Sequence, residues 1–150
     1  MEFLLPALST VLPHRRTRSV WRSGTTTTYY FQRNLLGDVI GIYNTSTKVS
    51  GYAYDAWGNC TITLNTNGIA TKNPIRYRGY YYDEVSGLYY LNARYYSPTW
   101  RRFISPDDTA YLELGTPNGI NLYIYCNNDP VNYADPSGCI AISTIIIGCL

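Results

Sequence analysis

The side chains best suited to metal or thiol chemistry in this chain are four cysteines and one histidine. The cysteines are Cys60, Cys126, Cys139 and Cys149, and the histidine is His14. A zinc site needs thiolates or imidazoles clustered at short spacing, and here no C-x-x-C pair occurs and the histidine lies far from every cysteine. We therefore expect no metal and no cofactor. Four cysteines are sparse for a disulfide framework; Cys139 and Cys149 are able to pair in an exported protein, and their spacing leaves both states open.

Two aspartates lie in strings that favour turns. Residues 135–138 read DPSG and residues 105–108 read SPDD. In such strings an aspartate accepts hydrogen bonds from nearby backbone amides, proline fixes φ, and glycine takes a left-handed conformation. The local sequence thus predicts that Asp107 and Asp135 shape turns.

The elements that must position these residues are short β-strands. The chain has 17 tyrosines beside 3 phenylalanines, and tyrosine, with an apolar ring and a polar tip, suits a half-wetted pleated sheet or a lined cavity. Strand-like runs at residues 29–33, 39–43, 49–54 and 61–64 alternate with turn residues, which is typical of a β-meander. No window of useful length in this half has a helical period.

The clearest hairpin has arms at residues 75–82 and 88–96, with a turn at residues 83–87. Alternation along the second arm predicts two faces, one with Tyr89, Leu91, Ala93 and Tyr95, and the other with Tyr90, Asn92, Arg94 and Tyr96. Beyond this hairpin the sequence is loop-like, and we expect a short helix at residues 121–125.

A weak internal repeat appears in two tyrosine-led turns. Residues 54–59 read YDAWGN and residues 82–87 read YDEVSG, and repeats of this kind are units that bury their faces by stacking on one another. The second of these turns lies within residues 76–96 (RYRGYYYDEVSGLYYLNARYY). Three further strings complete the pattern: RFISPD at 102–107, NNDPVN at 127–132 and DPSG at 135–138. Over about residues 28–138 the chain resembles the RHS/YD-repeat proteins, and residues 76–138 are similar to their RHS repeat-associated core domain.

This resemblance implies an all-β fold. The expected architecture is a tyrosine-rich antiparallel β-meander with hairpins that forms the end of a spiral YD-repeat shell, with an irregular or short-helical C-terminal plug. The implied divisions are a poorly ordered leader at 1–27, YD-repeat strands at 28–74, the repeat-associated core at 75–138, and a truncated apolar tail at 139–150. Family members are large bacterial proteins, often secreted or surface-delivered, whose hollow shell holds a C-terminal toxin.

In several members the core is also an aspartyl autoprotease. Two carboxylates held close together cannot both ionise, so one stays protonated and the pair can activate a water molecule. The resemblance assigns these roles to Asp107 and Asp135. The sequence departs from the family pattern because Asp107 is followed by Asp108, the fallback acid, and not by proline.

We therefore expect a structural fragment of a shell that encapsulates and presents a C-terminal toxin. Residues 139–150 are too short for a folded toxin, so the toxin itself is expected to be missing. The expected partners are the remainder of the shell or the toxin. One alternative is an aspartyl autoprotease that releases the C-terminal segment. A second is a carbohydrate or cell-surface binding module, because exposed tyrosines can stack on glycans.

Charge and hydropathy set limits on these alternatives. A net charge of +2 without a basic stripe predicts no nucleic-acid partner. The N-terminus has no basic region before its apolar run, so it makes no convincing signal peptide, although the resemblance implies a secreted or cell-surface location. The apolar end is about half of the roughly 20 residues that a membrane-spanning helix needs.

Overall fold

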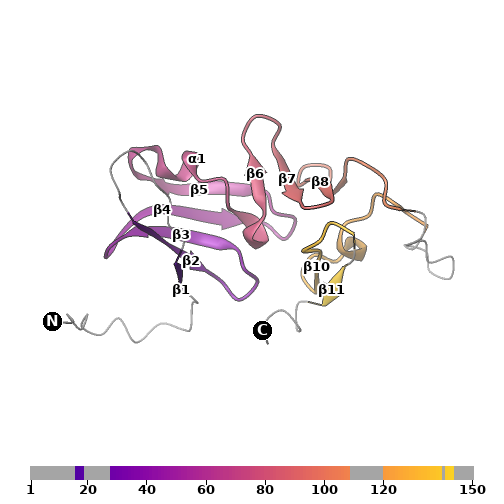
Figure 1. The fold of residues 1–150 in the computed structure, drawn as a ribbon, viewed down its shortest axis with the longest axis horizontal. Coiled ribbons are helices and arrows are strands. Elements are labelled where there is room, and N and C mark those ends of the chain that lie inside the picture. The colour runs from indigo at the N-terminus through magenta and orange to yellow at the C-terminus, as the bar shows by residue number, and fades with distance from the viewer. Residues whose placement is uncertain (1–15, 19–27, 109–119, 140, 144–150) are drawn as a thin grey trace.

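A computed structural model of the chain describes residues 16–18, 28–108, 120–139 and 141–143. Within this part the strands are antiparallel and form sheets of five, four and two strands (Figure 1). The helical structure there is limited to α1 (Ile69–Lys72) and to 3-10 turns at Thr66–Gly68, Tyr77–Gly79 and Cys126–Asn128. The expected all-β fold is thus confirmed.

The first sheet is a simple meander. Its order is β1-β2-β3-β4-β5, with bounds Arg16–Arg18, Tyr29–Arg33, Val39–Asn44, Thr47–Tyr54 and Cys60–Asn65. The four strands expected from turn spacing are all present. β1 lies within residues 1–27, and the rest of the expected leader is outside the described residues.

One face of the first sheet buries a mostly aliphatic core, which we call the first core. The buried members are Phe31, Val39, Ile42, Val49, Tyr52, Ile69 and Ala70. Two of them belong to α1, which packs on β4 and β5. The short helix therefore closes the core where the meander ends.

The second sheet corrects the expected hairpin. Its order is β6-β7-β8-β9, with bounds Tyr81–Asp83, Leu88–Leu91, Arg94–Ser97 and Arg102–Phe103. The first arm is short because a 3-10 turn occupies Tyr77–Gly79. The second arm is not one strand, because Asn92 takes a left-handed φ of 59° and starts a tight turn into β8.

That turn reverses which side chains face the core. Tyr89 and Leu91 are buried before it, whereas Arg94 and Tyr96 are buried after it and Tyr95 is exposed. The two predicted faces of residues 88–96 were therefore wrong beyond Asn92. Alternation holds only along an unbroken strand, and the turn at Asn92 interrupts the count.

The C-terminal part is irregular, as expected, but the short helix at residues 121–125 is wrong. Ile124 instead forms an isolated antiparallel bridge with Arg102. The 3-10 turn follows at Cys126–Asn128, where three successive residues have φ of 49°, 53° and 63°. Tyr125 itself is extended, with φ −104° and ψ 127°, and a right-handed helix cannot continue through the left-handed residues after it. β10 (Tyr133–Ala134) and β11 (Ile142–Ser143) then pair as a small hairpin.

Candidate functional site

The turn between β4 and β5, residues 54–59, is organised by Asp55. Its carboxylate accepts hydrogen bonds from the Trp57 amide (2.9 Å), the Asn59 amide (2.9 Å) and the Asn59 side chain (2.7 Å). Burial opposes the charge on this carboxylate, but the hydrogen bonds from Asn59 and the turn amides outweigh it and hold the pKa of Asp55 below its usual range. We call this element the YD turn.

Gly58 is needed where the YD turn meets the second sheet. Its φ is +89°, a conformation that side chains rarely adopt. A Cβ at this position would stand 2.7 Å from the ring of Tyr77. The aromatic ring therefore lies directly against the backbone of the turn, in a space that only glycine leaves open.

Three buried tyrosines from residues 77–96 donate their hydroxyls to successive carbonyls of the YD turn. The pairs are Tyr77 with Ala56 (2.7 Å), Tyr96 with Trp57 (2.7 Å) and Tyr89 with Gly58 (2.9 Å). Burial raises the pKa of all three phenols. Burying a hydroxyl is costly unless it forms a hydrogen bond. Each tyrosine ring is therefore held in the one orientation in which its hydroxyl reaches a carbonyl.

The same contact recurs elsewhere in the chain. The further pairs are Tyr52 with the Ala70 carbonyl (2.9 Å), Tyr54 with that of Val39 (2.8 Å) and Tyr80 with that of Asp135 (3.0 Å). Phenylalanine would fill the same space without a donor. The contact thus gives a physical reason for the excess of tyrosine over phenylalanine in this chain.

The two aspartates singled out in the sequence converge on one arginine. Oδ2 of Asp107 lies 2.7 Å from Nη2 of Arg94, and Oδ2 of Asp135 lies 3.9 Å from the same nitrogen. The side chains are 6% (Arg94), 13% (Asp107) and 3% (Asp135) exposed. The two carboxylates are therefore neighbours, although they are far apart in the sequence. Asp108 is exposed beside Asp107 and donates its amide to that carboxylate at 2.9 Å.

Arg94 makes further contacts with the closing segment, residues 102–138. Its Nε donates to the Gly138 carbonyl and its Nη1 donates to the Leu122 carbonyl at 3.0 Å. The guanidinium also stacks on Phe103, with Cζ 3.6 Å from the ring centroid. We call this cluster of Arg94, Asp107 and Asp135 the arginine cluster.

The second oxygen of Asp135 forms the turn that the DPSG string predicts. Oδ1 accepts from the Gly138 amide (2.8 Å), the Cys139 amide (3.1 Å) and the Ser137 hydroxyl (3.1 Å). Gly138 has φ +78°, and a Cβ there would collide with the carbonyl oxygen of Leu91. The turn therefore docks closely on the β7–β8 connection while Oδ2 of Asp135 faces Arg94.

Sequence reasoning missed Arg94. It lies on a strand among tyrosines, where a charged residue looks like part of a wetted face. The available signal was that a buried cation requires counter-charges, and two aspartates in turn-forming strings followed it in the chain. Among the described residues no group of three or more possible metal ligands occurs, and no helix there is long and apolar enough to cross a bilayer.

Several known proteins are similar to this chain in sequence or in structure. The tRNA3(Ser)-specific nuclease WapA of Bacillus spizizenii is 45% identical over 113 residues, which cover 73% of this chain and 5% of that protein. Toxin protein Tse5 of Pseudomonas aeruginosa is 45% identical over 75 residues, which cover 50% of this chain and 5% of Tse5. The crystal structure of TcdB2-TccC3 without its hypervariable C-terminal region matches with a TM-score of 0.64 at 32% identity, over 75% of this chain and 5% of that one. No family model matches the sequence.

The fold is therefore that of a tyrosine-rich antiparallel shell protein. This chain belongs to the RHS/YD-repeat proteins, and its relatives are toxin-associated proteins of the RHS and Tc types. It spans about one twentieth of the length of the relatives named here. The match to a structure without the hypervariable region shows that the likeness lies outside that region.

Proposed function

We propose that this chain is a structural fragment of an RHS/YD-repeat shell that encapsulates and presents a C-terminal toxin. The observation that carries this proposal is the set of hydrogen bonds from Tyr77, Tyr89 and Tyr96 to the YD turn. They join residues 28–74 to residues 75–138, the two parts that we propose as YD-repeat strands and repeat-associated core. Repeat units that cannot bury their faces alone gain stability from such contacts between neighbours.

The arginine cluster supports a structural role for the closing segment. Arg94 neutralises buried negative charge from Asp107 and Asp135, and its other donors bind the carbonyls of Leu122 and Gly138. A buried charge set of this kind is strongly destabilising to break once it is formed. In the proposed shell it fastens the irregular plug to the second sheet. A secreted or cell-surface location is part of the proposal, and relatives named as toxins support it.

A segment exchange tests the shell role. The 113 matching residues of the Bacillus spizizenii relative would be replaced by those of this chain. Limited proteolysis would then measure how fast the segment C-terminal to the exchanged residues is digested. We expect protection equal to that of the parent. A second exchanged version, with Tyr77, Tyr89 and Tyr96 changed to serine, should lose this protection from proteolysis. Equal digestion of the two exchanged versions would refute the shell role.

We propose aspartyl self-cleavage as the second candidate function, because Asp107 and Asp135 face the same guanidinium nitrogen. An aspartyl dyad needs two carboxylic acids held close together, and the fold brings these two candidate acids to one place. Against this role stands the guanidinium itself, which contacts both acids where a dyad needs room for water.

Intact mass over time separates the two candidates. A folded reporter would be fused behind Leu150, and the wild type would be compared with Asp107→Asn and Asp135→Asn. Asparagine keeps the Oδ1 acceptor that the turn at Asp135 uses. Loss of the reporter in the wild type alone would support self-cleavage. An unchanged mass in all three proteins would leave the shell role as the function of this segment.

A further inference from the structure

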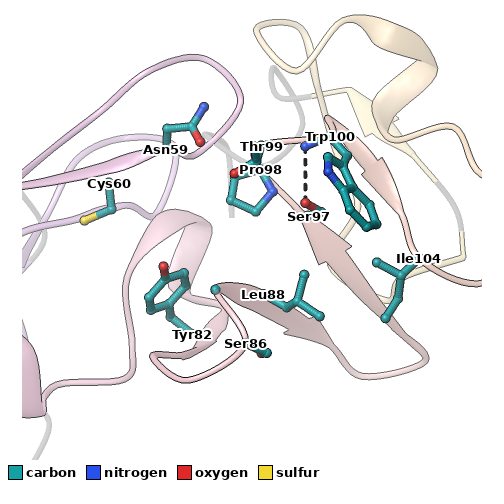
Figure 2. Close-up of a pocket in the computed structure, with 11 residues that line it drawn as sticks. Asn59, Cys60, Tyr82, Ser86, Leu88, Ser97, Pro98, Thr99, Trp100 and Ile104 are labelled. Carbon is teal, nitrogen blue, oxygen red and sulfur yellow. Dashed lines mark hydrogen bonds between the residues drawn. The ribbon is translucent and has the colours of Figure 1, made fainter.

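A pocket of about 560 Å³ opens where three turns meet. Asn59 comes from the β4–β5 turn and Cys60 from the start of β5, and Tyr82 and residues 86–88 come from the β6–β7 hairpin (Figure 2). Residues 97–100 of the β8–β9 turn and Ile104 complete the lining. Neither the proposed shell contacts nor the arginine cluster uses this space.

Two aromatic side chains border the pocket. Figure 2 shows Tyr82 and Trp100 on opposite sides, with Leu88 between them in this view. Trp100 is 67% exposed, and its amide donates to the Ser97 hydroxyl at 3.2 Å, which fixes the turn that carries it. The indole is therefore a solvent-exposed surface on an ordered backbone.

Tyr82 is held in place from behind. The Arg76 guanidinium lies 4.4 Å from its ring centroid, and the Tyr89 ring lies 4.9 Å away. A Cβ on Gly87 would be 3.8 Å from the Tyr82 hydroxyl. The ring is thus fixed by packing, and its hydroxyl lies beside the glycine at the rim of the pocket.

The polar groups that line the pocket are neutral. They are the hydroxyls of Tyr82, Ser86, Ser97 and Thr99 and the amide of Asn59, and none of the eleven lining residues in the described part of the chain carries a formal charge. A phosphate or carboxylate ligand needs a cation or a cluster of free amides. The lining therefore favours a ligand without charge.

We propose that this pocket binds a neutral sugar ring. A pyranose presents an apolar face of C–H groups and a rim of hydroxyls, so it matches an exposed indole bordered by hydroxyl and amide groups. Ligand sites of this kind combine aromatic walls with a few polar groups that fix orientation. The inference goes beyond the shell function and does not depend on it, since the pocket is built from turns within this chain.

The test is saturation-transfer difference NMR on the full 150-residue chain with glucose, galactose and N-acetylglucosamine as probes. At least one sugar should give a signal with the wild type, with a dissociation constant in the millimolar range. Trp100→Ala should weaken binding by about tenfold or more through loss of the stacking surface. Leu35→Ala is the matched control, since Leu35 is also highly exposed but lies outside the pocket, and it should bind as the wild type does.

Two further measurements test the proposal, one with the Trp100→Phe variant and one with glucuronate as the ligand. Trp100→Phe retains an aromatic surface and should keep most of the binding, which guards against misfolding of the alanine variant. Glucuronate should bind more weakly than glucose. No signal with any of the three sugars, equal signals for the wild type and Trp100→Ala, or stronger binding of glucuronate would each overturn a neutral-sugar site.

Discussion

The two cores of this chain are built from different chemistry. The first core is mostly aliphatic, whereas the core under the second sheet, which we call the second core, is mostly aromatic. The buried members of the second core are Tyr77, Tyr80, Tyr89, Leu91, Tyr96, Phe103, Tyr125 and Cys126. An aliphatic core is specified by volume and shape. A tyrosine core adds hydroxyls that must each find an acceptor, so it also specifies how neighbouring units are oriented.

Alkaline pH should distinguish the two cores most strongly. Burial raises the pKa of the tyrosines around the second core, namely Tyr54, Tyr77, Tyr80, Tyr89, Tyr96 and Tyr125. The unfolded chain therefore releases these protons at lower pH than the folded chain. Their contribution to the free energy of unfolding is fully present below about pH 10. As pH rises further, this contribution is lost by about 1.4 kcal/mol per pH unit for each such tyrosine.

The check is a titration of phenolate absorbance together with near-ultraviolet circular dichroism. The buried tyrosines with raised pKa values should form phenolates only as the fold is lost. The first core contributes Tyr52 and shares Tyr54, which packs against both cores. If every tyrosine ionised near pH 10 with the fold preserved, the second core would not be closed to solvent.

The next largest effect should come from the arginine cluster. Arg94→Met keeps the length of the side chain but leaves Asp107 and Asp135 without their common cation. Breaking a buried ion pair in this way costs about 3–5 kcal/mol. Urea unfolding followed by circular dichroism would measure it. Arg102→Met, on the exposed side of β9, is the matched control and should stay within about 0.5 kcal/mol of the wild type. Similar losses in both variants would count against the cluster.

Removing a single hydroxyl should give an intermediate effect. Tyr89→Phe leaves the Gly58 carbonyl buried without its donor, and such a loss costs about 1–3 kcal/mol. Tyr90→Phe removes a hydroxyl from the next residue, which is exposed on the opposite face, and should change stability by less than about 0.5 kcal/mol. The comparison between neighbours isolates the hydrogen bond from the ring. Equal stabilities of the two variants would show that ring packing alone joins the two sheets.

The smallest effect belongs to the first core. Ile42→Val removes one methylene from a buried side chain, and the expected loss is about 0.5–1.5 kcal/mol. The same urea unfolding measurement applies. A loss larger than that for Tyr89→Phe would reverse the comparison. The first core would then be the one whose stability is more sensitive to a small change in a buried side chain.

The sequence predicted the first sheet better than the second for a physical reason. Between residues 29 and 65 the turns carry asparagine, aspartate and glycine, which mark where strands stop. In the second sheet the break lies at Asn92, inside a run that alternates without interruption. A left-handed asparagine is permitted by its side chain but not demanded by it, so nothing local distinguished a turn from a strand.

The candidate site was predictable only in part. Asp107 and Asp135 stand out because proline and glycine accompany them. Their meeting at Arg94 depends on the way the plug folds back over the second sheet, which is a long-range property. The sequence raised carbohydrate binding as an alternative but did not place the proposed pocket. Its residues come from three regions that are separate in the sequence, and only the folded chain assembles them.

The hydrogen bonds at the YD turn determine which of its positions tolerate substitution. The hydroxyls of Tyr77 and Tyr96 reach the main-chain carbonyls of Ala56 and Trp57, and every amino acid offers that same acceptor. Mutation of Ala56 therefore keeps this hydrogen bond, and mutation of Trp57 keeps its acceptor but removes a side chain that packs against the second core. Asp55, Gly58 and Asn59, in contrast, are fixed by their own geometry. The alignment of the two sheets at this turn therefore depends on main-chain carbonyls as acceptors.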